Sequence, residues 1–333
     1  NLKQPEELLP LMRPYFIIQL ISLPFVCWFN TFRQFTDGIT DTRVAMWILV
    51  SGNIMNIFGN WVLIYGHLGM EEMGLIGAGL STMISRILMA LVMMGIFFFS
   101  KKYKEYRKGW HQGQTNRRDF RQITVLGFPL ALQMGMETAA FSLSSLMVGW
   151  FGTTALAAHQ VMLTISQLGY MIYYGLAAAV AVRISNFMGQ RDYTAVKRTA
   201  TAGIHLVFFL AMLTSVPIFI FRHSMGALFT DNTEVISMVS MTIIPFMIYQ
   251  FGDGMQCNYA NAMRGIAVVK PLIWIAFIAF FIVSLPLGYF FGVVMNFQLL
   301  GIWYAFPFGL TTAGILYYVY YQKGLKRIEE SAK

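Results

Sequence analysis

Long apolar stretches alternate with short polar ones along the whole chain. Nine of them reach the roughly 20 apolar residues that a helix needs to cross a hydrocarbon core of about 30 Å. They cover about 14–35, 44–66, 75–100, 122–149, 154–182, 199–221, 236–263, 270–292 and 298–322. A membrane β-barrel would instead show roughly ten-residue segments of alternating hydrophobicity. The pattern predicts an all-α integral membrane protein with nine transmembrane helices.

Composition supports this class and excludes others. Of 333 residues, 57% are hydrophobic and only 12% charged, whereas soluble domains carry about 25% charged residues. The two cysteines, Cys27 and Cys257, both lie in apolar runs, which excludes a disulfide scaffold and a cysteine-based metal cluster. The chain opens with Asn-Leu-Lys-Gln-Pro-Glu-Glu, which does not resemble a cleavable signal peptide.

The basic residues predict the orientation in the membrane. If the loops after the first, third, fifth and seventh segments and the C-terminus share one side, that side holds 18 of the 24 Lys and Arg residues. The positive-inside rule makes this side cytoplasmic and places residue 1 outside, in the cell membrane. The long 101–121 loop accounts for most of the net charge of +9. We therefore expect membrane lipid, not nucleic acid, as the surrounding partner.

A short internal repeat predicts two related lobes. Gly38-Ile39 followed by Arg43 and Trp47 recurs, with the same spacing, as Gly265-Ile266 followed by Lys270 and Trp274. Segments one to three therefore look like copies of segments seven to nine, and three further helices would have to precede residue 1. We expect a twelve-helix protein of two pseudo-symmetric lobes. Residues 1–121 would form the second half of the N-lobe with the inter-lobe loop, and 122–333 the complete C-lobe.

Two acidic residues lie deep in predicted membrane segments. Thirteen of the fifteen Asp and Glu residues fall in loops, tails or helix ends, but Glu137 and Asp253 are at least ten residues from either end of their segments. Such carboxyls usually line a cavity, because an unpaired charge in the hydrocarbon is costly. Tyr249 shares a helical face with Asp253 at spacing i,i+4. Hard oxygen ligands suit H⁺, Na⁺ or K⁺ rather than a transition metal.

Weaker polar signals occur nearer the N-terminus. Asn56 and Asn60 share one face of the second segment, and Thr82 lies early in the third. Such side chains often join helices to each other, so they form only a possible secondary polar site. Catalytic motifs such as GxSxG, HExxH and the P-loop do not occur in the sequence. We therefore expect a protein that is not an enzyme and holds no cofactor.

Several stretches resemble the multidrug and toxic compound extrusion (MATE) family, in particular its NorM-like branch. Gly127-Phe128-Pro129-Leu130 with Gln133 and Glu137, then Ala157-Ala158-His159-Gln160, is similar to the family's seventh helix and the approach to its eighth. Tyr249-Gln250 with Asp253, then Arg264-Gly265, resembles its tenth helix. Phe35-Thr36-Asp37-Gly38 and Gly77-Ala78 with Thr82 resemble its fourth-to-fifth loop and sixth helix. The similarity covers essentially the whole chain, without the first three helices.

The resemblance implies a monomeric antiporter that exports cationic or amphipathic compounds in exchange for Na⁺ or H⁺. It makes Glu137, Tyr249 and Asp253 the cation site of the C-lobe. Asn56 and Thr82 match the N-lobe site of another branch, but Asn60 stands where that branch has Asp.

Two alternatives remain open. A lipid-linked glycan flippase of the same superfamily would be expected to line its cavity with arginines, whereas the spanning segments hold few, mainly Arg86. An intramembrane enzyme could use Glu137 and Asp253 as an acid–base pair, but no nucleophile or metal motif accompanies them.

The orientation yields a direct prediction. A membrane-impermeant thiol reagent applied outside should label a cysteine introduced at Glu71 and leave one at Lys104 unlabelled. Both variants would be compared before and after permeabilisation. Labelling of Lys104→Cys alone in intact cells would reverse the orientation that the basic loops predict.

Overall fold

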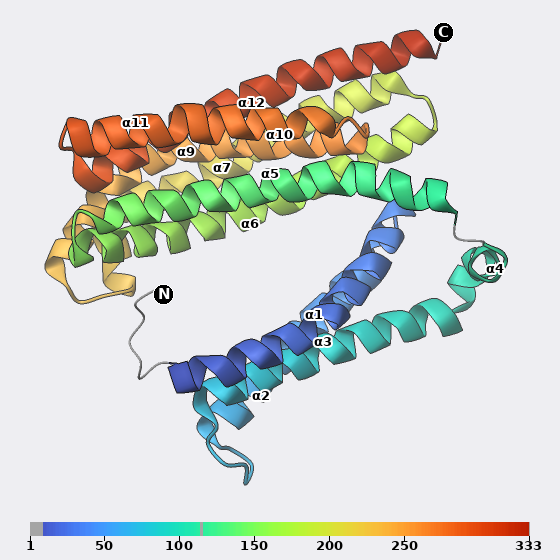
Figure 1. The fold of residues 1–333 in the computed structure, drawn as a ribbon, viewed down its shortest axis with the longest axis horizontal. Helices are drawn as coiled ribbons and strands as arrows, with labels where there is room; N and C mark the ends of the chain where they lie inside the picture. Colours follow the sequence, from blue (N-terminus) through green and yellow to red (C-terminus); the bar gives the residue numbers. More distant parts are fainter. Residues whose placement is uncertain (1–8, 114–115, 333) are drawn as a thin grey trace. The chain divides into compact units, whose positions relative to one another are not determined.

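The computed structural model describes residues 9–113 and 116–332, and these are joined into a series of helices (Figure 1). The helices are α1 (Leu9–Gly38), α2 (Thr42–Tyr65), α3 (Gly74–Phe99), η2 (Lys101–Tyr103), α4 (Lys104–Gln112), α5 (Arg117–Gly149), α6 (Thr153–Gly189), α7 (Tyr193–Ile220), α8 (Arg222–Met225), η3 (Gly226–Leu228), α9 (Thr233–Gly265), α10 (Lys270–Ala276), η4 (Phe277–Ser284), α11 (Leu285–Tyr289), η5 (Phe290–Val294) and α12 (Gln298–Ser331). The four elements from α10 to η5 form one continuous helical run, in which η4 and η5 are π-helical.

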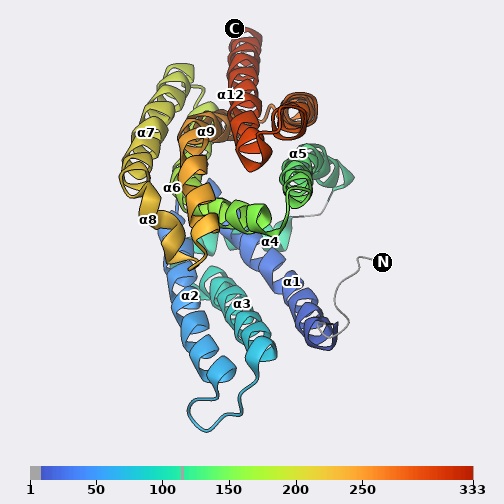
Figure 2. The ribbon, with the colours of Figure 1, turned by 90° about the vertical axis from the view of Figure 1, so that its left-hand side faces the viewer.

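The chain divides into two compact units, Asn1–Thr115 and Asn116–Lys333. In the first unit, α1 and α2 both pack against α3. In the second unit, α9 lies between α6, α7 and α12, while α5 packs mainly against α10 and α6 (Figure 2). Helix α9 is therefore the central helix of the second unit, and most of its second half is buried.

The all-helical membrane class is confirmed, with one difference in the segment count. Eight of the described helical segments are long and apolar enough to cross a membrane. The predicted segment 122–149 is helical as part of the 33-residue α5, but it is not among those eight. Gln122, Gln133 and Glu137 make this segment less apolar than the others, so its crossing stays a prediction based on length.

The segments are also helical beyond their apolar parts. Helix α12 continues about nine residues past the predicted end at 322, and the 101–121 loop contains η2, α4 and the start of α5. Lys, Arg and Glu are good helix formers, so a charged sequence ends the apolar stretch without ending the helix.

The repeated sequence at Gly38 and Gly265 forms the same helix-ending turn twice. Thr40 and Ala267 take left-handed backbone angles, with φ of 62° and 58°. In each turn, the next residue's N–H donates to the carbonyl five positions back, at 2.8 and 3.0 Å, and the left-handed residue's N–H donates three positions back, at 3.0 Å in both. These are the two bonds of a Schellman motif, which satisfies carbonyls that a helix end leaves free.

A third turn of this kind lies outside the repeated sequence. Between α6 and α7, Arg191 has φ of 60°, and the two equivalent hydrogen bonds measure 3.0 and 3.1 Å. Gly189 stands two residues before Arg191, as Gly38 and Gly265 do before their left-handed residues. The feature that all three sequences share is therefore a glycine two positions before the left-handed residue. The isoleucine that follows Gly38 and Gly265 is not part of it, because Gln190 follows Gly189.

In the first unit, the residues after α3 are fastened to the first of these turns. The Asp41 carboxylate is 8% exposed, accepts a hydrogen bond from the Tyr103 hydroxyl and lies 2.7 Å from the Lys102 ammonium. Burial alone would raise the pKa of Asp41, but the hydrogen bonds from Lys102 and Tyr103 and the nearby positive charges lower it below 3.8 overall. Burial and Asp41 together raise the pKa of Tyr103. We call Asp41, Lys102 and Tyr103 the linker anchor.

Glycines permit the closest helix contacts in both units. A Cβ at Gly77 would lie 2.4 Å from the Leu63 carbonyl oxygen of α2, and one at Gly301 would lie 2.4 Å from the Phe291 carbonyl carbon. Both partners are backbone atoms, which cannot move aside as a flexible side chain would. Small residues that let backbones approach are a common basis of helix packing in membranes.

We expect Gly77→Ala to destabilise the first unit by about 1–3 kcal/mol, the range found for overpacking. Gly95→Ala is the matched control on the same helix, because a Cβ there meets nothing within 4 Å. Thermal unfolding in detergent would compare the two variants with the wild type. Equal stability of Gly77→Ala and the wild type would contradict the close contact.

We expect Asp41→Asn to release the linker anchor and speed hydrogen exchange over residues 100–108. A lowered pKa means that the wild-type carboxylate stabilises the anchor fully above pH 3.8 and loses this effect only as the pH falls through the lower value. Protection should therefore fall at acidic pH in the wild type but show no such step in the variant. Asp192→Asn is the control, because Asp192 caps α7 and lies in the other unit.

Candidate functional site

A cavity of about 340 Å³ lies within the second unit, between α5, α6 and α9. Its walls are formed by Met134, Glu137, Thr138, Phe141, Leu163, Ser166, Gln167, Tyr170, Tyr249 and Asp253. The structure thus brings the three predicted residues Glu137, Tyr249 and Asp253 to one cavity, although 116 positions separate the two carboxyls in the sequence. Asp253 is only 3% exposed and Tyr249 only 5%.

Each carboxylate at this cavity has a neutral hydrogen-bond donor from a different helix. The Tyr173 hydroxyl of α6 donates to Asp253 Oδ2 on α9. The Gln256 amide of α9 donates from Nε2 to Glu137 Oε1 on α5, at 3.1 Å. Sequence reasoning missed both donors, because Tyr173 is one of sixteen tyrosines and Gln256 follows Asp253 without forming a recognised motif.

A buried histidine supports the aromatic side of the site. His159 is fully buried, and its Nδ1 accepts a hydrogen bond from Trp303 Nε1 at 3.1 Å. Because Nδ1 is an acceptor, the proton of the neutral ring is on Nε2, which then donates to Ser145 Oγ at 3.0 Å. The Trp303 ring lies 5.8 Å from the ring of Tyr249. His159 therefore holds the tryptophan against which Tyr249 packs.

An arginine is held by amides near Glu137. Arg264 Nη2 donates to Gln133 Oε1 at 3.2 Å, and Nη1 lies 3.5 Å from Asn261 Oδ1. Gln133 precedes Glu137 by four residues on α5, so the guanidinium lies about one helical turn from the carboxylate along that helix. A positive charge thus stands near the site but is bonded to uncharged groups.

The secondary polar residues also come together, within the first unit. Asn56 Nδ2 donates to Ser81 Oγ and Thr82 Oγ1, both at 3.3 Å, and Asn60 Nδ2 donates to Asn56 Oδ1 at 3.3 Å. Ser81, which directly precedes Thr82 on α3, is thus also a member of this cluster. Asn60 Oδ1 is buried without a hydrogen-bond partner among the described residues. The cluster joins α2 to α3 and contains no carboxylate.

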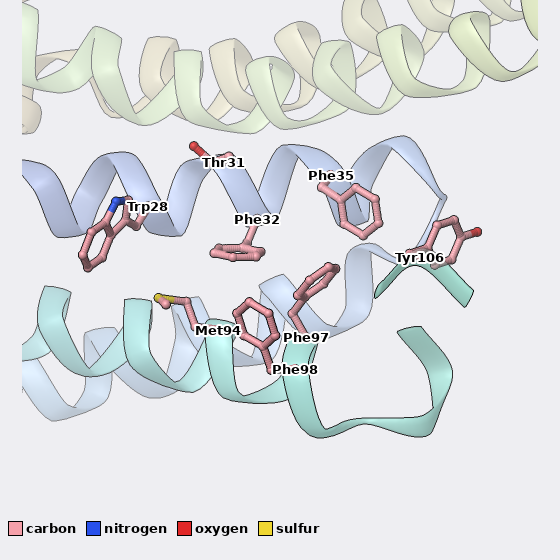
Figure 3. A pocket seen from close by; sticks show the side chains of 8 residues that line it. All are labelled: Trp28, Thr31, Phe32, Phe35, Met94, Phe97, Phe98 and Tyr106. Atoms are coloured by element: carbon pink, nitrogen blue, oxygen red, sulfur yellow. The ribbon is translucent and has the colours of Figure 1, made fainter. Parts of the chain in front are cut away.

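A second, larger cavity of about 460 Å³ lies in the first unit, between α1, α3 and α4 (Figure 3). Its walls are Trp28, Thr31, Phe32, Phe35, Met94, Phe97, Phe98 and Tyr106. Aromatic rings dominate this lining, and none of the described lining residues is charged. Among the two cavities, only that of the second unit offers groups that bind a cation by charge.

The family model for MatE matches residues 2–62 and 129–290. These two stretches cover more than half of the chain and include Glu137, Tyr249 and Asp253. The chain belongs to the MatE family. It is therefore a multi-pass membrane transporter, and the enzyme alternative is excluded.

Similar MATE proteins carry multidrug-resistance names. The chain is 30% identical over 318 residues to the "Probable multidrug resistance protein NorM" of Photorhabdus laumondii, covering 94% of this chain and 70% of that protein. It is 32% identical over 316 residues to the "Multidrug resistance protein NorM" of Aliivibrio fischeri, covering 93% of this chain and 68% of that protein. The NorM-like recognition is confirmed.

Solved MATE structures show the same fold. An outward-facing multidrug resistance MATE transporter superposes with a TM-score of 0.87 at 18% identity, covering 98% of this chain and 72% of the other. A Pyrococcus furiosus transporter of the MOP superfamily, described as having a binding pocket of reversed polarity, superposes with a TM-score of 0.85 at 17% identity and the same coverages. These superpositions show that the chain has the fold of these transporters.

Proposed function

We propose that this MATE transporter is a cation-coupled antiporter that exports cationic or amphipathic compounds in exchange for Na⁺ or H⁺. The observation that carries the proposal is the cavity of the second unit, where Glu137 and Asp253 approach from two different helices. Two carboxylates in one enclosed site attract either a coupling ion or a cationic solute. The multidrug names of the similar proteins support the same substrate class.

We propose that Glu137, Asp253 and Tyr249 bind the coupling cation. Carboxylate and hydroxyl oxygens suit Na⁺ or H⁺ better than a transition metal. Exchange follows when ion and solute compete for the same negative charge, so that binding of one releases the other. The Asn56, Asn60 and Thr82 cluster would then join helices rather than exchange ions, since it lacks a carboxylate.

The polarity of the cavity argues against a glycan flippase. Such a protein would need basic residues facing its substrate, but Arg86 Nη1 is bonded to Gln19 Oε1 and Ser22 Oγ, both at 2.6 Å. Arg264 is bonded to Gln133 and Asn261. The arginines closest to the interior of each unit thus hold neighbouring helices, while the acidic side chains line the cavity.

We further propose the lobe assignment and orientation that the sequence predicts. Residues 1–121 would be the second half of the N-lobe with the linker, and 122–333 the C-lobe. The boundary between the two compact units, at Thr115 and Asn116, lies within the same linker and supports this division. The basic linker and C-terminal helix end would face the cytoplasm.

We expect Asp253→Asn and Glu137→Gln each to abolish ion-driven transport while leaving the fold intact, because each removes one negative charge and keeps the shape. Tyr249→Phe should be milder and weaken the ion response about fivefold, corresponding to about 1 kcal/mol for one neutral oxygen. The measurement is drug movement in vesicles containing the whole protein, with Na⁺ and pH gradients imposed separately.

The matched control is Glu234→Gln, which removes an exposed carboxylate from the start of α9, the helix that carries Asp253. It should keep wild-type transport under both gradients. Wild-type gradient dependence in both Asp253→Asn and Glu137→Gln would show that coupling resides outside this cavity. Loss under only one of the two gradients would identify the coupling ion.

A further inference from the structure

The donors to the two carboxylates share an unusual placement. Tyr173 and Gln256 are 1% and 4% exposed, and neither belongs to the side chains that line the cavity. Each donates to one oxygen of its carboxylate without itself lining the cavity. These two bonds do not involve the second oxygens, Asp253 Oδ1 and Glu137 Oε2, and the cavity-lining Tyr249 is a further hydrogen-bond donor to Asp253.

The two donors also link three helices in series. Helix α6 supplies Tyr173 to Asp253 on α9, and α9 supplies Gln256 to Glu137 on α5. Asp253 and Gln256 are three residues apart and lie on neighbouring positions of one face of α9. Both hydrogen bonds therefore involve α9.

Both donors are uncharged, and this determines their effect on the charge of the two carboxylates. A hydrogen bond from a neutral donor stabilises a carboxylate's negative charge without cancelling it. A lysine or arginine in the same place would neutralise the carboxylate and compete with the coupling ion. Neutral donors thus compensate part of the cost of a buried charge and keep that charge available.

We propose that Tyr173 and Gln256 are positioning residues that set the affinity of this site for the coupling cation. The inference rests on the proposed function of Glu137 and Asp253 and adds two residues that do not themselves touch the cavity. Their hydrogen bonds fix the orientation of the two carboxylates and stabilise the ionised form of each. The neighbouring Tyr174, whose ring stacks on Tyr170 at 5.1 Å, has no carboxylate partner among the described residues.

The test measures transport rate against Na⁺ or H⁺ concentration in vesicles containing the whole protein. Tyr173→Phe removes one hydroxyl and keeps the ring, and Gln256→Leu removes the amide at similar volume. Loss of a donor to a carboxylate disfavours the charged form and favours protonation. Each variant should therefore raise the half-saturating Na⁺ concentration about tenfold or, if H⁺ is the coupling ion, lower the half-saturating H⁺ concentration by a similar factor, with the maximal rate little changed. Tyr174→Phe, the matched control, should leave both quantities at wild-type values.

The outcomes separate the two proposals. A wild-type ion concentration curve for Tyr173→Phe and Gln256→Leu, together with loss of coupling in Asp253→Asn, would overturn this inference and leave the proposed function standing. Wild-type coupling in Asp253→Asn and Glu137→Gln would overturn the proposed function itself. A lower maximal rate with an unchanged half-saturating concentration would show a purely structural role and also overturn the inference, and drug binding would confirm that each variant is folded.

Discussion

The structure depends on one constraint, which is that a polar group inside the hydrocarbon must find its partner within the protein. Asp253 and Glu137 can lie deep in the membrane because Tyr173 and Gln256 donate to them from adjacent helices. This need places α9, which carries both Asp253 and Gln256, between α6, α7 and α12. The half of α9 that carries Asp253 and Gln256 is accordingly mostly buried within the second unit.

Much of the fold could be predicted because its signals are local. A run of about 20 apolar residues, or a carboxyl ten residues inside one, can be recognised without knowledge of any other segment. The contacts that complete the site are not local in this sense. Tyr173 meets Asp253 across 80 positions, and Gln256 meets Glu137 across 119. Nothing in the sequence near Tyr173 distinguishes it from Tyr170 or Tyr174, so only packing reveals which hydroxyl reaches the carboxylate.

The helix-ending turns are a second example of what the sequence alone does not reveal. The matching sequences Gly38-Ile39 and Gly265-Ile266 form the same turn, but the left-handed residues of the three turns are Thr40, Ala267 and Arg191, which have no chemistry in common. Backbone hydrogen bonds define this turn, and side chains only have to tolerate it. A sequence comparison that scores side chains therefore finds two copies and misses the third, after Gly189.

The position of Arg264 fits the cation exchange that we propose for the cavity with two carboxylates. A guanidinium bonded directly to Glu137 would form a buried ion pair, in which a cationic solute or coupling ion would have to displace a tethered charge. Instead, Gln133 stands between them, since it accepts from Arg264 and precedes Glu137 by one helical turn. The arginine acts on Glu137 only through its electric field, because its direct contact is with the Gln133 amide and the direct contact of Glu137 is with the Gln256 amide. A site built in this way stabilises its negative charge by hydrogen bonds from neutral groups and does not cancel that charge with a directly bonded cationic side chain.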